Sequence, residues 1–217
     1  MTGLGFSLVS APLLIAVLGP REGVQTALVL STFLNVALLV RTHRAVLVRE
    51  GALLLVPAVA TTPFLAYASR RIDGTILTVS AGVLTIASAV ALASGLRWSR
   101  GTHPVAGMAS GVVSAAMNVV GSIGGPALAI YSVNAGWPPV RARPTLQVIF
   151  LTSNIVALVS LGLPRRDPSQ VGLFVAMVIG LVIGLRLHRW IPEGVARNAT
   201  LGVAALGGAV AVARALL

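Results

Sequence analysis

Uncharged, apolar segments alternate with short arginine-bearing loops along almost the whole chain. Cutting the sequence at its charged residues and at His103 leaves uncharged segments over residues 1–20, 23–40, 51–69, 74–96, 104–140, 144–164, 168–185 and 198–213. Most of these segments are near the roughly 20 residues that a helix needs to cross a bilayer. The pattern predicts an all-α polytopic membrane protein with no soluble domain.

The fifth segment is the longest, and helix-breaking residues interrupt its centre. Gly121, Gly124 and Gly125 each cost about 1 kcal/mol relative to alanine inside a helix, and Pro126 has no amide hydrogen. A single helix over residues 104–135 would be about 48 Å long, whereas the hydrocarbon core is about 30 Å thick. We expect a descending arm over Pro104–Val120, an unwound turn over Gly121–Gly125 and a short returning helix over Pro126–Ala135.

A weak internal repeat links the two halves of the chain. A shift of 119 residues superposes Pro20 on Pro139, Thr26 on Thr145, Asn35 on Asn154, Arg70 on Arg189 and Ile72 on Ile191. A shift of 114 residues aligns the glycine-rich stretch Gly3–Pro12 with Val119–Pro126. The repeat predicts two pseudo-symmetric halves, residues 1–98 and 99–217. Each half would contain a glycine-rich broken or re-entrant helix and about three spanning helices.

The first half has no counterpart of the arm over Pro104–Val120. Two expectations follow: the true start lies 15–20 residues upstream, or the first hairpin has only its returning arm. The first arginine, Arg21, follows the first apolar segment, so we expect no cleavable signal peptide.

The charge pattern indicates orientation in a membrane. The net charge of +11 comes from sixteen arginines and no lysine, spread singly or in small groups over short loops, which favours a positive-inside bias over a nucleic-acid surface. If every segment crosses once, the arginines divide eight to eight. If both glycine-rich elements re-enter, the division is ten to six, the six being Arg21, Arg70, Arg71, Arg165, Arg166 and Arg214. The second arrangement predicts two halves of opposite orientation, as in many secondary transporters.

Several classes of chemistry are not expected. There is no cysteine, and His43, His103 and His188 are isolated from one another, so no metal site or cofactor is predicted. All five carboxylates lie at segment ends or in loops rather than at mid-membrane depth. We find no nucleophile–base pair and no phosphate-binding motif, so the chain is not expected to be an enzyme.

The glycine-rich stretches are candidate anion sites. Short helices that begin at mid-membrane would direct unpaired N–H groups and positive dipole ends towards one cavity. The first candidate ligands are Ser7, Ser10, Ser122, Gly124 and Gly125. The alternative role for these small residues is close helix packing, the role that we assign to Gly107/Gly111 and Gly180/Gly184.

Asparagines in the interior of apolar segments are further candidates. Asn35 and Asn154 occupy matched positions of the repeat, and a buried amide must be hydrogen-bonded. Either a ligand or another helix could supply the partner. Asn118 is a candidate on the same argument, with Gln147, Thr152 and Ser153 as weaker ones. Tyr131 and Trp137 are expected to anchor the short helix at the interface.

Four short stretches resemble the sulfite exporter TauE/SafE family of membrane transporters: GLGFSLVSAPLL, LGPREGVQTALVLS, GSIGGPALAIY and PPVRARPTLQVIF. The resemblance implies a multi-pass protein of the plasma (inner) membrane that carries small sulfur-containing anions, such as sulfite, sulfoacetate or other organosulfonates, and exports them. A channel-like anion pore and a membrane scaffold that transports nothing are the alternatives. The expected partners are the small-anion substrate and the lipid bilayer, with no nucleic acid, and a homo-oligomer is left open.

Overall fold

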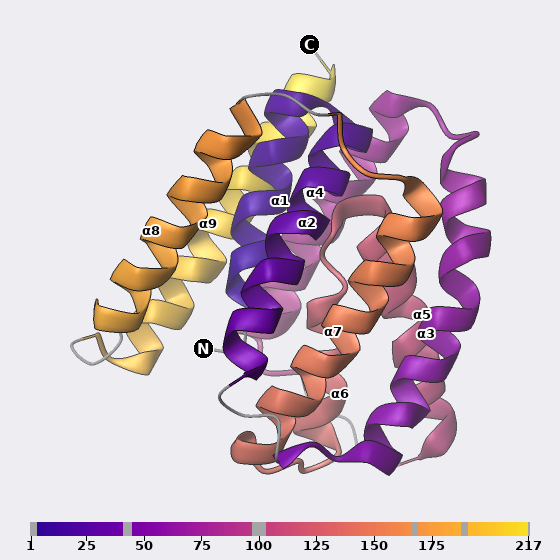
Figure 1. The fold of residues 1–217 in the computed structure, drawn as a ribbon, viewed down its shortest axis with the longest axis vertical. Coiled ribbons are helices and arrows are strands. Elements are labelled where there is room, and N and C mark those ends of the chain that lie inside the picture. The colour runs from indigo at the N-terminus through magenta and orange to yellow at the C-terminus, as the bar shows by residue number, and fades with distance from the viewer. Residues whose placement is uncertain (1–3, 41–44, 97–102, 166–168, 188–190, 217) are drawn as a thin grey trace.

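The computed structural model describes residues 4–40, 45–96, 103–165, 169–187 and 191–216, and no strand occurs within these ranges. The helices are α1 (Leu4–Leu18), α2 (Pro20–Leu39), α3 (Val48–Ser69), α4 (Gly74–Ala93), α5 (Pro104–Gly121), α6 (Gly125–Asn134), α7 (Pro139–Leu161), α8 (Ser169–Leu187) and α9 (Glu193–Leu216) (Figure 1). The all-helical fold predicted from the sequence is therefore confirmed for the described part of the chain.

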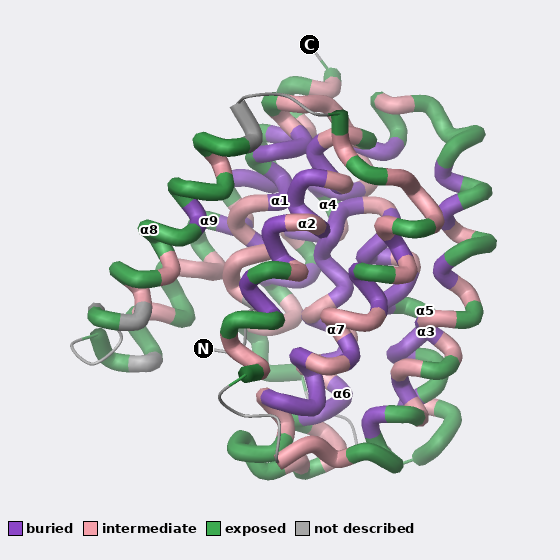
Figure 2. The backbone as a smooth tube through the Cα atoms, in the orientation of Figure 1, coloured by how far each residue is buried: buried purple, intermediate pink, exposed green. Residues whose placement is uncertain are grey.

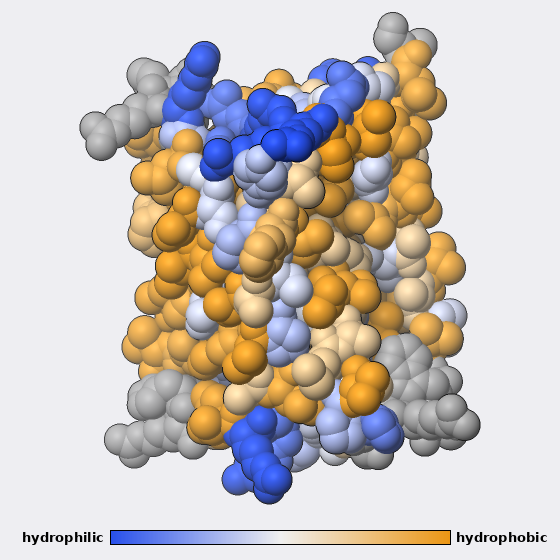
Figure 3. All heavy atoms as spheres, turned by 90° about the vertical axis from the view of Figure 1, so that its right-hand side faces the viewer, coloured by the Kyte–Doolittle hydropathy of each residue, from blue (hydrophilic) through white to orange (hydrophobic). Residues whose placement is uncertain are grey.

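Six of these helices are long and apolar enough to cross a membrane: α2, α3, α4, α5, α7 and most of α9. The apolar part of α8, Val171–Gly184, is shorter than these six helices, although the sequence analysis included its segment among the expected crossings. One face of the molecule shows a wide apolar band between hydrophilic atoms at the two ends (Figure 3). Such a band matches the hydrocarbon core of a bilayer, and the chain is a multi-pass membrane protein.

The predicted break in the fifth segment is present. Helix α5 ends at Gly121 and α6 begins at Gly125, each within one residue of the expected boundary. The first half differs, because α1 is unbroken from Leu4 to Leu18 with Pro12 inside it, so the break expected within Gly3–Pro12 does not occur among its described residues. The physical reason is that no glycine lies between Phe6 and Leu18, whereas three interrupt the second stretch.

Two pairs of helix starts fit the proposed repeat register, which stays a prediction. Helix α7 begins 119 residues after α2, at Pro139 against Pro20, and α9 begins 119 residues after α4, at Glu193 against Gly74. The boundary between the halves at residues 98 and 99 lies outside the described residues, as does Arg189. A two-fold relation between the halves stays a prediction.

The two short helices end at opposite ends of the molecule. Arg214, near the end of α9, donates to the carbonyl of Ala16 near the end of α1 (3.1 Å). Arg197, near the start of α9, donates to the last carbonyl of α4 (3.3 Å), and Asn134 at the end of α6 donates to the Leu96 carbonyl just beyond α4 (3.1 Å). Helices α1 and α6 therefore lead from the interior in opposite directions (Figure 1).

Glycine contacts hold the spanning helices close together. A Cβ on Gly111 of α5 would overlap the Leu54 carbonyl oxygen of α3, and one on Gly82 of α4 would lie 2.7 Å from the Gly208 carbonyl oxygen of α9. Helix α8, by contrast, is exposed over most of its length (Figure 2), and a Cβ on Gly180 or Gly184 would meet no described atom within 4 Å. The expected packing role is confirmed for Gly111, while Gly180 and Gly184 make no such contact within the described chain.

Alanine at Gly111 should therefore be far more damaging than alanine at Gly180. Gly111→Ala forces a methyl group into the backbone of α3, and overpacking of this kind costs about 1–3 kcal/mol or more. Gly180→Ala adds a methyl group where there is space and gains up to about 1 kcal/mol of helix propensity. Thermal unfolding of the two variants in the same detergent measures the difference. Equal melting temperatures would contradict the close approach of α3 and α5.

Candidate anion site

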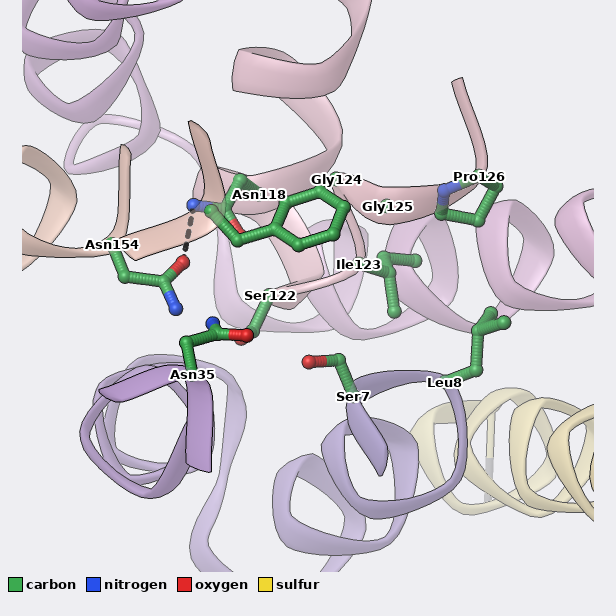
Figure 4. Close-up of a pocket in the computed structure, with 11 residues that line it drawn as sticks. Ser7, Leu8, Asn35, Asn118, Ser122, Ile123, Gly124, Gly125, Pro126 and Asn154 are labelled. Carbon is green, nitrogen blue, oxygen red and sulfur yellow. Dashed lines mark hydrogen bonds between the residues drawn. The ribbon is translucent and has the colours of Figure 1, made fainter. Parts of the chain in front are cut away.

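A small cavity lies where α1, α2, α7 and the α5–α6 break meet. Its free volume is about 20 Å³, room for about one water molecule. Four elements supply its walls: Ser7 and Leu8 of α1, Asn35 of α2, Phe150 and Asn154 of α7, and Asn118, Ser122, Ile123, Gly124, Gly125 and Pro126 around the break. Figure 4 shows the polar side chains of this set converging from three sides.

The break itself is built around Ser122. Its N–H donates to the Asn118 carbonyl (2.8 Å), and the next N–H, that of Ile123, donates to the Met117 carbonyl (3.3 Å). These bonds end α5 with Ser122 in the left-handed conformation, at φ 55° and ψ 29°. Among the described residues it is the only one other than glycine with positive φ. A side chain there costs about 1–2 kcal/mol that glycine would avoid.

The Ser122 hydroxyl adds a second cost at the same position. The side chain is 2% exposed, and its oxygen has no hydrogen-bond partner among the described residues. A buried hydroxyl without a partner costs about 1–3 kcal/mol. Because the residue also lines the cavity, a ligand that hydrogen-bonds to the hydroxyl would explain why serine occupies a position that suits glycine better.

The start of α6 supplies backbone donors next to this hydroxyl. Gly125 and Pro126 occupy the first turn, and the N–H groups of Gly124 and Gly125 make no backbone hydrogen bond to another described residue. Free N–H groups and the partial positive charge of a helix N-terminus favour an anion. Ser7, in the first turn of α1, lines the same cavity, and its hydroxyl lies 3.0 Å from that of Ser31.

Three buried asparagines complete the polar lining. The Asn118 amide donates to Oδ1 of Asn154 (3.1 Å), which couples the end of α5 to α7. This bond leaves the Nδ2 group of Asn154 available as a donor. Asn35, 4% exposed, approaches from α2, and its amide forms no hydrogen bond to another described residue. The matched asparagines of the repeat therefore face one cavity from two helices.

Gly124 also has the close-packing role that the sequence analysis gave as the alternative to ligand binding. A Cβ at this position would lie 2.6 Å from the Ser114 carbonyl oxygen and 3.1 Å from the Asn118 Cβ, both on α5. Any larger residue would push α6 away from α5. Gly124→Leu would therefore disturb the break itself, and it is a poor probe of ligand contact.

The structure brings seven of the eight predicted site residues to the cavity: Ser7, Asn35, Asn118, Ser122, Gly124, Gly125 and Asn154. Ser10 is the exception, because its hydroxyl donates to the Phe6 carbonyl of its own helix (2.8 Å). The weaker candidates Gln147, Thr152 and Ser153 do not line it either. Sequence reasoning missed the apolar wall of Leu8, Ile123, Pro126 and Phe150, which carries no signal that distinguishes it from other core residues.

Tyr131 and Trp137, expected to anchor the short helix, pack edge to face with ring centroids 6.0 Å apart and do not line the cavity.

Within the described ranges no group of three or more His, Cys, Asp or Glu side chains is placed to hold a metal ion. The cavity is thus a neutral site, rich in hydrogen-bond donors, inside an apolar body.

Comparison with known protein families gives a match over most of the chain. The model of the family described as sulfite exporter TauE/SafE matches residues 1–211. No curated protein and no solved structure matches the chain. Since the family model covers nearly the whole chain, this protein belongs to the sulfite exporter TauE/SafE family.

Proposed function

We propose that the protein exports small sulfur-containing anions, sulfite or organosulfonates, across the plasma membrane, and that the cavity around Ser122 is their binding site. The observation that carries the proposal is the buried Ser122 hydroxyl, which has no partner among the described residues. Ser122 lines the cavity together with Gly124 and Gly125 at the N-terminus of α6. Family membership supports transport of such anions. Hydrogen-bond donors fixed in an apolar interior are what a desolvated oxyanion requires.

Transport would require the cavity to widen. Sulfite has four heavy atoms, whereas the present volume of about 20 Å³ holds about one water molecule. Movement of α1 and α2 relative to the α5–α6 break would open the space, since these elements face each other across it (Figure 4). The conformation described is then a closed state of an alternating-access carrier.

Counterflow in proteoliposomes tests this function. Vesicles preloaded with unlabelled sulfite should transiently accumulate labelled sulfite from outside, because a carrier exchanges one bound anion for another. A channel-like pore would carry the anion without this overshoot. Vesicles that contain folded protein but carry neither sulfite nor methanesulfonate faster than protein-free vesicles would contradict the proposal and favour a scaffold.

We also propose that the two halves are inverted, with the α5–α6 hairpin re-entering from the cytoplasmic side. Two observations support this arrangement: the starts of α2 and α7, and of α4 and α9, are each 119 residues apart, and α6 returns to the end of the molecule where α5 begins (Figure 1).

In the cysteine-free chain, single cysteines at His103 and Arg141 should both label from the cytoplasm. Labelling of the two from opposite faces would remove the model of a re-entrant hairpin.

A further inference from the structure

The lining of the cavity sets a limit on the charge of its ligand. Among its eleven residues none is ionisable: the polar ones are serines and asparagines, and the rest are glycine, proline or apolar. The described charged residue nearest in sequence to the lining is Arg143, seven residues before Phe150 and close to the start of α7, and it does not line the cavity. Arg21, Glu22 and Asp73 lie at helix ends. The most strongly hydrophilic atoms likewise gather at the two ends of the face in Figure 3, and only weakly hydrophilic ones lie between them.

A neutral site treats one and two negative charges very differently. The cost of removing an ion from water grows with the square of its charge, so a dianion loses about four times the hydration free energy of a monoanion of the same size. The attraction of fixed dipoles and hydrogen-bond donors grows only in proportion to the charge. Without a cation in the lining, the second charge adds more cost than attraction.

The same side chains can also accept a hydrogen bond. The hydroxyls of Ser7 and Ser122 and the amide of Asn35 point into one space (Figure 4), and each carries lone pairs as well as donors. A singly protonated oxyanion has an O–H group that can donate to one of these oxygens. A fully ionised dianion has none, so an acceptor that faces it is repelled.

We propose that this site selects monoanions: hydrogen sulfite rather than sulfite, and alkanesulfonates, which carry one charge at every physiological pH. The inference rests on the proposed function and adds the charge state of the substrate. It assigns the selectivity to the neutral lining around Ser122, Asn35 and Asn154, so the dianions sulfite and sulfate are excluded although their shape and size suit the same donors.

Initial rates in proteoliposomes test the proposal with the unaltered protein. Labelled sulfite, methanesulfonate and sulfate are offered at pH 6, 7, 8 and 9, with equal pH inside and outside and a fixed potassium diffusion potential that is positive inside. Protein-free vesicles are measured in parallel and subtracted, because hydrogen sulfite is in equilibrium with sulfur dioxide, which crosses lipid unaided. Methanesulfonate is the internal control, since its charge does not change over this range.

The sulfite rate should fall with the fraction of hydrogen sulfite, about 10-fold for each pH unit above its ionisation near neutrality. The methanesulfonate rate should stay constant, and sulfate should be carried at least about 10-fold more slowly. A sulfite rate that stays level or rises with pH while methanesulfonate is carried would overturn charge selection and leave the proposed function standing. Absence of flux for all three anions would overturn both.

Discussion

Replacing Ser122 by glycine should strongly lower anion transport at low anion concentrations while leaving the protein folded. The substitution removes a hydroxyl that lies in the cavity without a partner among the described residues. A hydrogen bond to a charged ligand contributes about 1.5–3 kcal/mol, so its loss corresponds to a roughly 10- to 150-fold weaker apparent affinity. Concentration-dependent flux in proteoliposomes measures this change directly.

Stability should respond in the opposite sense to flux at this position. Glycine adopts φ 55° without the strain of a side chain, so the substitution stabilises the folded state by about 1–2 kcal/mol. The greater freedom of glycine in the unfolded chain offsets about 0.5–1 kcal/mol of that gain. Ser122→Gly should therefore melt at or slightly above the temperature of the unaltered protein, whereas Ser122→Ala keeps the strain and loses the hydroxyl.

Ser88→Ala is the matched control. Ser88 of α4 is also buried, and its hydroxyl also has no partner among the described residues, but it does not line the cavity. Its removal should leave flux unchanged. If Ser88→Ala lowers transport as much as Ser122→Gly does, or if Ser122→Gly transports normally, the hydroxyl of Ser122 does not bind the anion.

The break in the second half was readable from sequence because its cause is local. Gly121, Gly124, Gly125 and Pro126 disfavour a helix in any surroundings. In the structure α5 ends at the first of these residues, and α6 begins at the third. The first half shows the limit of the argument from repeats. Its one described glycine, Gly5, lies near the start of α1, and Gly3 lies outside the described residues, so the described part of the aligned stretch is helical through Pro12.

Which polar side chains reach the cavity depended partly on tertiary structure. Asn35 and Asn154 could be predicted, because a buried amide needs a partner and the repeat matches the two positions. Ser7 and Ser10 could not be told apart, since a serine inside a helix can bond to the carbonyl four residues earlier, as Ser10 does. The close approach of Gly124 to α5 depends on the packing of two helices, and no spacing in the sequence encodes it.

Transport should be driven by membrane voltage without a proton gradient. No lining residue of the cavity can titrate, so the described site offers no side chain to carry a proton together with the anion. One elementary charge moved through 100 mV corresponds to about 2.3 kcal/mol. Because cells are negative inside, this energy favours export of an anion, and a monoanion could be held about 50-fold lower inside than outside.

Methanesulfonate is the anion with which to measure the coupling, because its charge is independent of pH and no change of protonation can be mistaken for proton transport. In proteoliposomes, a potassium diffusion potential of 100 mV, positive inside, should drive its accumulation towards about 50-fold. An imposed pH gradient at zero potential should drive none. Accumulation that follows the pH gradient and ignores the potential would mean that a titratable group outside this cavity couples protons to the anion, and the argument from the neutral lining would then fail.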